Sequence, residues 1–559
     1  MPLMGSLYVG TSGLQTSQNA LNTTAHNLSN LETNGYVRQQ VLLGDRVYSN
    51  IGNSAISIKQ VGLGVDYSKV RQVRDAFLDK SYRKEAGRSA FYNVCYETTS
   101  EMETLLGELE GASFKTSLSN FWTSVEELKK DPTSAVVQGQ FVSKASEFLT
   151  RAQAVYDGLY AYQDNLNAQI RDSVDEINAY GHKIFEYNMA IKRAEIGSEE
   201  ANDLRDARNL IMDKLGELVN MSYSEDPEGV IEVSIEGSSF VLRDRVFEMG
   251  YTQDAGTGFY TPVWPQNDDV PVFNVSQEIS SAINTDIGKV KAILLARGDR
   301  RGNYTDLGAD IYNNGVVTDA AGNPTGQKVQ ATSSSLIMNT QAEFDRLIHS
   351  IVTEVNNILT GEKAEIDAGG TPSYTNKEDC GIELFVRLGT GRYEEKTDAA
   401  GNVTYTYVPE DTSGSPANVS TMYTVANLKI NPDLLKQPTL LSFVTADKQA
   451  DQTKADALAN AFDTPFSVLN PNSTKPYSYK DFYSAIVSQV ANTGFVYKSI
   501  SGSQEGTVQS LENARQSVMG VSSNEELTNM IKFQNAYNAS SRYINVINEM
   551  LGHIIERLG

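Results

Sequence analysis

Histidine and cysteine side chains are the usual zinc ligands in proteins, and both can also act in covalent catalysis. The chain contains His26, His182, His349, His553, Cys95 and Cys380. None of them lies in a zinc-protease, nucleophile-elbow or paired-cysteine pattern, in which only a few residues separate the reacting groups. Two cysteines are also too few for a disulfide framework. The sequence therefore predicts inert thiols, no metal site and no catalytic residue, and for His26 a hydrogen-bonding role at a helix end.

Paired carboxylates can act as general acid and general base, and two short acidic clusters contain such pairs. Glu101 and Glu103 form the first, and Glu108 and Glu110 form the second. Both lie in a stretch with helical periodicity, where such charges are typical of a solvated face. A glycosidase brings its two carboxylates together in three dimensions, so spacing alone leaves that reaction open. Because no histidine or cysteine motif is present and the acidic pairs fit a solvated face, we expect that the protein is not an enzyme.

Two glycine-containing patterns have the composition of ligand-binding loops. Residues 61–65 read Val-Gly-Leu-Gly-Val, but no clear amphipathic helix follows, as a phosphate-binding loop requires. Asp-Ala-Ala-Gly-Asn occurs at 319–323 and again at 398–402, with too few carboxylates for a calcium loop. We interpret the first pattern as a tight turn between strands and the other two as hairpin turns with glycine at positive φ. No cofactor is predicted.

The composition restricts the class of partner. The 559 residues carry a formal charge of -23, and such an acidic surface repels phosphate backbones and anionic lipid. We therefore expect no nucleic-acid partner. No run of about 20 apolar residues exists, so no membrane insertion is expected. The first basic residue is Arg38, whereas a secretory signal begins with a basic region. The chain is expected to stay in the cytosol or to leave by another route.

The N-terminal segment has the pattern of a helix with one narrow apolar stripe. The stripe consists of Leu7, Leu14, Leu21, Leu28 and Leu31, with the small residues Gly10, Ser17 and Thr24 between the first four. Period 3.5 is the spacing that a partner helix covers. Residues 1–37 contain one carboxylate and no lysine or arginine. The segment is either a short surface helix on its own domain or a helix enclosed by other helices on most sides.

The C-terminal segment predicts a coiled-coil helix. Ser522 with Glu525, or Ser523 with Glu526, fits the capping box that begins a helix. One stripe then alternates steps of three and four residues through Met530, Phe533, Tyr537, Ser540, Ile544, Ile547, Leu551, Ile554 and Leu558. Isolated helices are marginal in water, so this helix needs partners. We expect both ends to be largely unfolded in the monomer and to order on assembly.

Both ends also resemble a known group of proteins. Residues 25–39 read AHNLSNLETNGYVRQ, and they are similar to the signature of flagellar rod, hook and hook-associated proteins, with a turn formed by Asn27, Asn30, Gly35 and Tyr36. Residues 520–527, GVSSNEEL, and 534–542, QNAYNASSR, resemble the C-terminal signature of the same group. The resemblance implies that the two terminal helices are assembly interfaces that line the channel of a tubular axis.

The middle of the chain distinguishes members of that group. Helical stripes recur from Asp75 to Leu218, for example Leu118, Phe121, Val125 and Leu128. The resemblance implies that rod and hook proteins would instead be rich in strands there. Residues 202–208, NDLRDAR, followed by MDKL at 212–215, resemble a segment of the hook-associated protein 1 family. The resemblance is firm over 1–240 and 480–559 and loose between them. The alternatives are a hook or distal rod protein, or a surface adhesin that binds through residues 361–474.

The family resemblance implies a structural subunit in a self-associated ring between hook and filament. The expected partners are hook protein below, a second hook-associated junction protein above, and a flagellar export chaperone in the cytosol. The expected route is the flagellar type III export pathway, and the expected location is the extracellular flagellum. These partners and this route follow from the resemblance alone.

The expected fold class is α+β and multidomain: terminal coiled-coil helices, a long-helix bundle and β-rich outer insertions. Period-two patterns after residue 226, with a turn at Gly237-Ser238, indicate strands. The predicted division is an inner domain of 1–65 and 523–559, a bundle of 66–221, 330–360 and 475–522, a β-rich outer domain of 222–329, and a variable β-rich insertion of 361–474.

Overall fold

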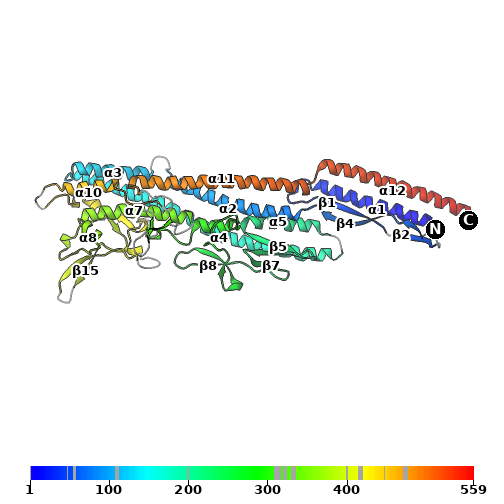
Figure 1. The fold of residues 1–559 in the computed structure, drawn as a ribbon, viewed down its shortest axis with the longest axis horizontal. Coiled ribbons are helices and arrows are strands. Elements are labelled where there is room, and N and C mark those ends of the chain that lie inside the picture. The colour runs from blue at the N-terminus through cyan, green and yellow to red at the C-terminus, as the bar shows by residue number, and fades with distance from the viewer. Residues whose placement is uncertain are drawn as a thin grey trace.

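The computed structural model describes residues 2–46, 48–53, 58–107, 113–197, 200–307, 316–318, 324–328, 335–397, 401–412, 419–445, 447, 449–469 and 476–558. The chain forms an elongated rod in which both termini lie at the same end (Figure 1). A pair of helices occupies that end, long helices run through the middle, and short sheets project from one side. The fold is therefore mainly helical and built from several parts.

The terminal end combines two helices with two small sheets. Helix α1 spans Pro2–Ser29 and α12 spans Ser523–Leu558. Between α1 and the bundle, β1 (Gln39–Asp45) pairs antiparallel with β4 (Val65–Gln72), and β2 (Tyr48–Asn53) pairs antiparallel with β3 (Ile58–Gly62). Gly64 has φ +98° just before β4, so the predicted tight turn is present, although it does not join a paired hairpin.

Four consecutive helices confirm the helical region expected between Asp75 and Leu218. They are α2 (Ala76–Leu106), α3 (Phe114–Lys130), α4 (Ala135–Ala194) and α5 (Asn202–Leu218). Asp75 caps α2, because its carboxylate accepts hydrogen bonds from the backbone N–H groups of Phe77 and Leu78. Helices α7 (Leu336–Thr360) and α11 (Tyr479–Met519) join the same bundle, and Ser335 and Ser478 cap them.

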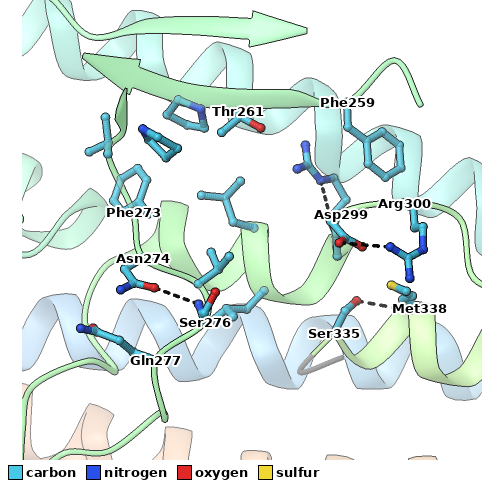
Figure 2. Close-up of a pocket in the computed structure, with 18 of the residues that line it drawn as sticks. Phe259, Thr261, Phe273, Asn274, Ser276, Gln277, Asp299, Arg300, Ser335 and Met338 are labelled. Atoms are coloured by element: carbon cyan, nitrogen blue, oxygen red, sulfur yellow. Dashed lines mark hydrogen bonds and ion pairs between the residues drawn. The ribbon is translucent and has the colours of Figure 1, made fainter. Parts of the chain in front are cut away.

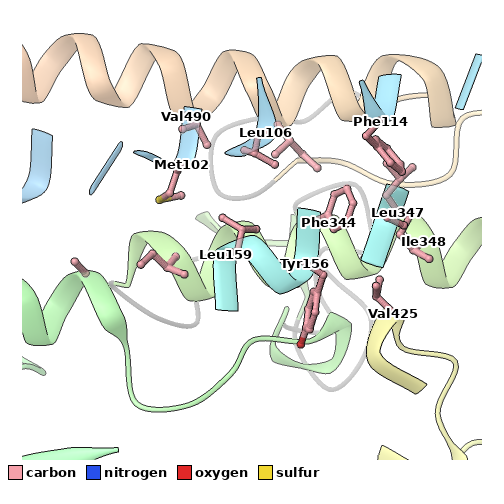
Figure 3. Packing of buried hydrophobic residues seen from close by; sticks show 14 of the residues in the cluster. Met102, Leu106, Phe114, Tyr156, Leu159, Phe344, Leu347, Ile348, Val425 and Val490 are labelled. Atoms are coloured by element: carbon pink, nitrogen blue, oxygen red, sulfur yellow. The ribbon is translucent and has the colours of Figure 1, made fainter. Parts of the chain in front are cut away.

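The expected apolar stripes form the bundle core. Leu118, Phe121, Val125 and Leu128 are all buried, as are the stripes of α4. Figure 3 shows Phe114 of α3 close to Phe344 of α7, and Val490 of α11 farther along the same core, near Met102. The ring of Phe114 lies 5.0 Å from that of Phe344, a contact between segments more than 200 residues apart in the chain. Side chains contributed by distant helices therefore hold the bundle together.

Short sheets follow α5. One has the strand order β5 (Met221–Glu225), β6 (Ile231–Ile235), β7 (Ser238–Val241). A second contains β8 (Gly250–Gln253), β9 (Tyr260–Trp264) and β10 (Val270–Pro271), and helix α6 (Lys289–Arg297) comes next. Strands β11 (Val316–Thr318) and β12 (Pro324–Lys328) form a third, and the first Asp-Ala-Ala-Gly-Asn copy between them lies outside the described residues.

The turn between β6 and β7 corrects the predicted position by one residue. Glu236 and Gly237 have φ values of 48° and 81°, and Ser238 is already the first residue of β7. Two successive positive φ values match the twist of a two-residue hairpin. The turn is therefore Glu236-Gly237, not Gly237-Ser238.

Residues 361–469 mix strands with short helices. The strands are β13 (Ser373–Tyr374), β14 (Phe385–Arg387), β15 (Tyr393–Thr397), β16 (Val403–Tyr407) and β17 (Leu428–Ile430), and the helices are α8 (Lys363–Asp367), α9 (Pro432–Lys436) and α10 (Gln452–Asp463). Gly401 has φ +84° before β16, while 398–400 of the second repeated pentapeptide lie outside the described residues. Helix α10 lies with the bundle, because the Phe462 ring contacts the Phe121 ring at 5.5 Å.

Short 3₁₀ helices occupy Glu195–Gly197, Pro265–Asn267, Tyr304–Asp306, Lys377–Asp379, Val419–Thr421, Val425–Asn427 and Pro438–Leu440. Across the described part of the chain, no helix is both long enough and apolar enough to cross a bilayer.

Candidate assembly interface

The predicted signature turn is held by the side chain of Asn27. This buried amide accepts hydrogen bonds from the Tyr36 hydroxyl at 2.8 Å and the Gln39 backbone N–H at 3.0 Å, and it donates to the Gln39 carbonyl at 2.9 Å. Gly35 has φ +81°, a conformation that favours glycine. One asparagine thus ties the last turns of α1 to the start of β1 and fixes the chain reversal.

Asn30 and His26 complete the end of α1. The Asn30 amide donates to the His26 carbonyl at 3.0 Å and accepts from the Thr33 hydroxyl at 3.0 Å, so it satisfies groups that the ending helix leaves open. The His26 ring lies 3.4 Å from an Asp203 carboxylate oxygen and meets the Tyr36 ring edge-on at 5.5 Å. The expected hydrogen-bonding role of His26 is therefore present in the structure.

Helices α1 and α12 pack side by side and run in opposite directions (Figure 1). Gly10 faces Ile544, and a Cβ on Gly10 would lie 2.7 Å from Cγ1 of that side chain. Gly13 faces Ser540, and a Cβ there would lie 2.8 Å from the serine oxygen. The small residues of α1 therefore allow close approach, and Ser540, the polar member of the C-terminal stripe, sits opposite a glycine.

The two predicted stripes line this contact but are only partly covered by it. Leu7, Leu14, Leu21 and Leu28 are half-buried, as are Met530, Phe533, Tyr537, Ile544 and Leu551, whereas Ile547 is buried. Leu31 and Ile554 are exposed, and the side chain of Leu558 lies outside the described ones. One helix covers only one side of another, so the pair leaves apolar area in contact with water.

A second set of apolar side chains on α12, which the sequence interpretation did not identify, lies on the side of the helix opposite the predicted stripe. It consists of Leu527, Ile531, Val546 and Met550, with Ile531 60 % and Met550 50 % exposed. Leu527 and Ile531, and likewise Val546 and Met550, are four residues apart, which is a helical spacing, so the signal was present. Exposed apolar side chains on one face of a helix are typical of an interaction site. We call these four residues the outer face of α12.

Arg38, directly after the signature turn, joins it to the start of α12. Its guanidinium contacts Glu525 at 3.0 Å and the buried Glu526 at 2.9 Å, and its backbone N–H donates to the Met519 carbonyl at 2.9 Å. These contacts link residues almost 490 positions apart. Both ends of the chain are therefore fastened to each other at the point where the helix pair meets the bundle.

Buried charges lie just inside the bundle at this joint. The Arg515 guanidinium contacts Asp79 at 3.1 Å and Asp213 at 2.8 Å, and Arg83 contacts Asp213 at 2.6 Å. Arg74 also pairs with Asp79. Removing one partner from such a cluster leaves an uncompensated buried charge, so the cluster favours one arrangement of α2, α5 and α11.

The structure shows what the two acidic residues of the segment NDLRDAR, residues 202–208, do. Asp203 accepts from the Gln39 amide at 3.0 Å, and Asp206 accepts from the Val37 N–H at 3.0 Å, so both carboxylates hold the chain that follows the signature turn. Burial raises the pKa of Asp206 to about 7. The first two acidic residues of α5 therefore face the terminal helix pair.

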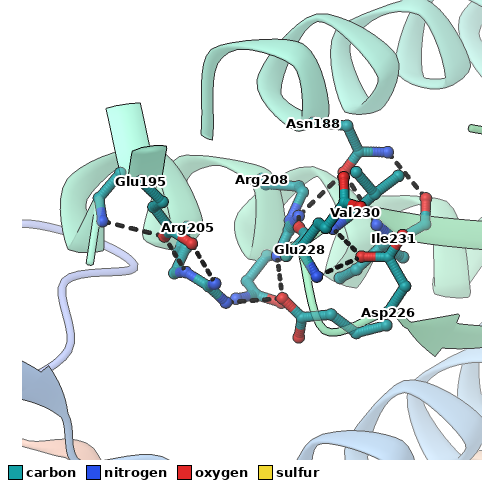
Figure 4. Close-up of polar contacts among 12 residues, drawn as sticks. Asn188, Glu195, Arg205, Arg208, Asp226, Glu228, Val230 and Ile231 are labelled. Carbon is teal, nitrogen blue, oxygen red and sulfur yellow. Dashed lines mark hydrogen bonds and ion pairs between the residues drawn. The ribbon is translucent and has the colours of Figure 1, made fainter. Parts of the chain in front are cut away.

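The two arginines of the same segment contact other parts of the chain (Figure 4). Arg205 pairs with Glu195 at 2.7 Å. The buried Arg208 donates to the Asn188 side chain at 2.9 Å, and Asn188 in turn bonds the backbone of Ile231 in β6. Helix α5 thus connects the signature turn, α4 and the first sheet, which sequence spacing alone does not reveal.

A pocket of about 1280 Å³ lies between β9, the loop after β10 and the ends of α6 and α7 (Figure 2). The two arginines that line it already have partners. Arg297 donates to the Asn167 side chain at 2.6 Å and lies 4.6 Å from the Phe259 ring, and Arg300 contacts Asp306 at 2.7 Å. The described residues contain no group of three or more histidine, cysteine and carboxylate side chains placed to hold a metal ion. The geometry at the ends of the chain is therefore the main candidate for function.

Three family models match successive parts of the chain. The model of the flagellar hook-associated protein FlgK helical domain matches residues 99–371. The flagella basal body rod protein model matches 7–36, and the model of the C-terminal part of flagellar basal body rod FlgEFG proteins matches 515–557. The hook or distal rod alternative predicted mainly strands between the ends, and both this match and helices α2–α5 contradict it.

Relatives of known name extend over nearly the whole chain. Flagellar hook-associated protein 1 of Bacillus subtilis is 25% identical over 554 residues, covering 98% of this chain and 96% of that protein. The protein of that name from Escherichia coli is 24% identical over 562 residues, covering 97% and 98%. The flagellar hook junction protein FlgK from Burkholderia pseudomallei has a similar fold, with a TM-score of 0.50 at 13% identity over 78% of this chain and 100% of that one. The chain belongs to the flagellar hook-associated protein 1 family.

Proposed function

We propose that this chain is a structural subunit of the bacterial flagellum that forms the ring between hook and filament. The observation that carries this proposal is the terminal helix pair, which leaves the outer face of α12 exposed at one end of an elongated molecule. Its membership of the hook-associated protein 1 family gives the place of that assembly. The apolar area that one molecule cannot cover is buried when copies and neighbouring axial proteins pack around it.

The partners follow from the position of such a ring. Hook protein meets the lower face, a second hook-associated junction protein meets the upper face, and other copies of the chain meet the sides. The predicted apolar stripes of both helices, from Leu7 to Leu31 and from Met530 to Leu558, line these axial contacts together with the outer face of α12. The ring then adapts a hook that bends to a filament that is stiffer.

The layers of the molecule have separate tasks in this proposal. Residues 1–65 and 523–559 form the inner layer, and 66–221, 330–360 and 475–522 form the bundle around it. The segments 222–329 and 361–474 project outward, except that α10 belongs with the bundle because of the contact between Phe462 and Phe121. The inner layer gives axial continuity, and the bundle sets the lateral contacts.

The exposed apolar side chains of α12 must be shielded from water before assembly. In the cytosol a flagellar export chaperone binds the apolar faces of α12 in the manner of a helix lying in a groove. The chain then travels unfolded through the flagellar type III pathway and becomes ordered at the extracellular junction. Ends that are disordered in the monomer suit passage through a narrow channel.

Removal of residues 523–559 tests the proposal. The shortened chain lacks α12 but keeps the bundle core, so we expect a folded, soluble monomer that no longer joins the hook. Circular dichroism checks the fold, and immunoblotting of isolated hooks and filaments measures incorporation. Incorporation of the shortened chain at the normal level contradicts the role given to α12.

A further inference from the structure

A pocket of about 450 Å³ is lined by residues of α2, of β5 and of the segments beside them. Helices α2 and α5 and strand β5 lie close together in the middle of the molecule (Figure 1). Lys80 and Lys84 contribute to it from α2, and Tyr223 contributes from β5. Val219, Met221 and Ile287 supply apolar surface, and Ile283, which is 61 % exposed, extends that surface outward. The pocket therefore combines an apolar lining with positive charge.

The two lysines have no carboxylate partner within the described structure. Arg83, which also lines the pocket, is already neutralised by Asp213 at 2.6 Å. The Lys80 ammonium lies 5.5 Å from the Tyr223 ring, and neither Lys80 nor Lys84 forms an ion pair with any described residue. Both are exposed and one helical turn apart, a spacing at which like charges repel.

The absence of acid here contrasts with the chain as a whole. Among the described residues that line the pocket there is no aspartate or glutamate, although the sequence carries 70 acidic and 47 basic residues. Asn220 and Ser222 add amide and hydroxyl donors beside the lysines. A ligand that matches this pocket has a carboxylate to pair with the lysines and to accept hydrogen bonds from Asn220 and Ser222. It also has aliphatic groups beside the carboxylate, to pack on the apolar lining. An aspartate or glutamate side chain within an apolar protein surface has both properties.

We propose that this pocket binds an acidic side chain of a second copy of the chain within the ring. The proposal rests on the proposed function, because the ring brings copies side by side. Charge complementarity favours this occupant, because every copy carries a large excess of carboxylates. Two such acidic surfaces repel each other, and two lysines in a carboxylate-free pocket offset that repulsion where the copies meet. The exposed Ile283 buries apolar area in the same contact.

Competition between two chains in one cell tests the contact. Wild-type chain and the double variant Lys80→Glu, Lys84→Glu are produced together, and their ratio in isolated hook–filament structures is read from peptide masses. We expect the variant to be depleted about tenfold relative to its share of the exported chain. The neutral pair Lys80→Ala, Lys84→Ala gives a smaller depletion. A variant present at its exported share overturns the proposal.

The control is Lys115→Glu, Lys183→Glu, which changes the charge equally at two exposed lysines without ion pairs in the described structure. It is expected to be incorporated at parity, and its depletion to the same extent overturns the proposal, because net charge alone then explains the effect. Circular dichroism confirms that each purified variant is folded.

Cross-linking identifies the occupant directly. A carbodiimide joins lysine amines to carboxylates in contact, and isolated wild-type hook–filament structures are treated with it and digested. We expect Lys80 or Lys84 to be joined to a carboxylate of this chain that is distant from them within one molecule. Links only to another axial protein, or no link, overturn the proposal. Failure of wild-type chain to appear in these structures contradicts the proposed function instead, so the two failures are distinguishable.

Discussion

Gly10 of α1 lies directly against Ile544 of α12, so close that a Cβ on the glycine would come within 2.7 Å of Cγ1 of the isoleucine. Gly5, one and a half turns earlier on the same helix, has nothing within 4 Å of the position that its Cβ would occupy. The same substitution made at each glycine therefore separates the effect of packing between α1 and α12 from the effect of helix propensity.

Gly10→Val is expected to weaken the helix pair, because the added branched side chain must displace Ile544. Gly5→Val introduces the same residue without a clash. We expect the first variant to be depleted several-fold from isolated hook–filament structures when it competes with wild-type chain, and the second to be incorporated at nearly the wild-type level. Equal incorporation of both variants means that this close contact does not form in the assembled state.

The ends of the isolated monomer are predicted to be less protected than the bundle. The stripes of α1 and α12 stay half-buried in one molecule, whereas the cores of α3 and α4 are fully buried. Hydrogen exchange in dilute solution is expected to be fast over α1 and α12 and slow over α2–α5, and to become slow at the ends after assembly. Strong protection of both ends in the monomer contradicts the expectation that they order on assembly.

Glu343 is predicted to make the stability of the bundle depend on pH. Burial on α7 raises its pKa from 4.5 to about 8. The folded state therefore keeps a proton that the unfolded chain loses, so the free energy of unfolding is largest below about pH 4.5 and falls as the pH rises towards 8. At pH 7 this linkage costs on the order of 3 kcal/mol.

Glu343→Gln removes the ionisable group and keeps its shape. In urea unfolding at a series of pH values, the variant is expected to gain stability over wild type between pH 5 and pH 8. Glu186→Gln, at an exposed position on α4, serves as the control and is expected to show no such trend. A constant difference between Glu343→Gln and wild type across this range is inconsistent with a buried neutral glutamate.

Glu362 is expected to be essential for the order of the segment after α7. Its buried carboxylate accepts from Arg392 at 2.7 Å and from the hydroxyls of Tyr374 at 2.9 Å and Tyr393 at 2.5 Å. Glu362→Ala removes the shorter of the two ion pairs of the buried Arg392 guanidinium and leaves it only Glu383 at 3.8 Å, which costs about 3 kcal/mol. We expect faster limited proteolysis within 361–469, with incorporation into flagella retained because the chain ends drive assembly. Unchanged proteolysis shows that this cluster does not hold the segment.

Arg515→Ala is expected to loosen the joint. It leaves Asp79 and Asp213 with one cation fewer in a buried cluster, at a cost of about 3 kcal/mol. Arg151→Ala, at an exposed position on α4, is the control and is expected to change the melting temperature little. Equal melting temperatures for the two variants argue against an energetic role for the joint.

Patterns that depend on neighbouring positions were predictable from the sequence. The period of Leu118, Phe121 and Val125 located buried helix faces, and Asp75 marked the start of α2, because capping and periodicity are local properties. The turn of Asn27 and Gly35 was located through the resemblance to the flagellar signature. Pairing between helices such as α1 and α12 was expected only in outline.

Features created by distant contacts were not predictable. Nothing near Arg38 indicates Glu526, and nothing near Asp206 indicates the backbone of Val37. The outer face of α12 was missed because an apolar stripe has the same spacing whether it faces a core or solvent. Helix α10 was assigned to an outer segment because only the folded chain brings Phe462 to Phe121.

Helix α4 runs for 60 residues without interruption, which corresponds to a length of about 90 Å. It begins near α9 and ends beside α5, which holds the signature turn through Asp203 and Asp206. If a rigid helix of this length rotates by about five degrees about the α5 end, its other end moves by roughly 8 Å. A small angular adjustment at the α5 end is thus converted into a large displacement at the α9 end of the same molecule.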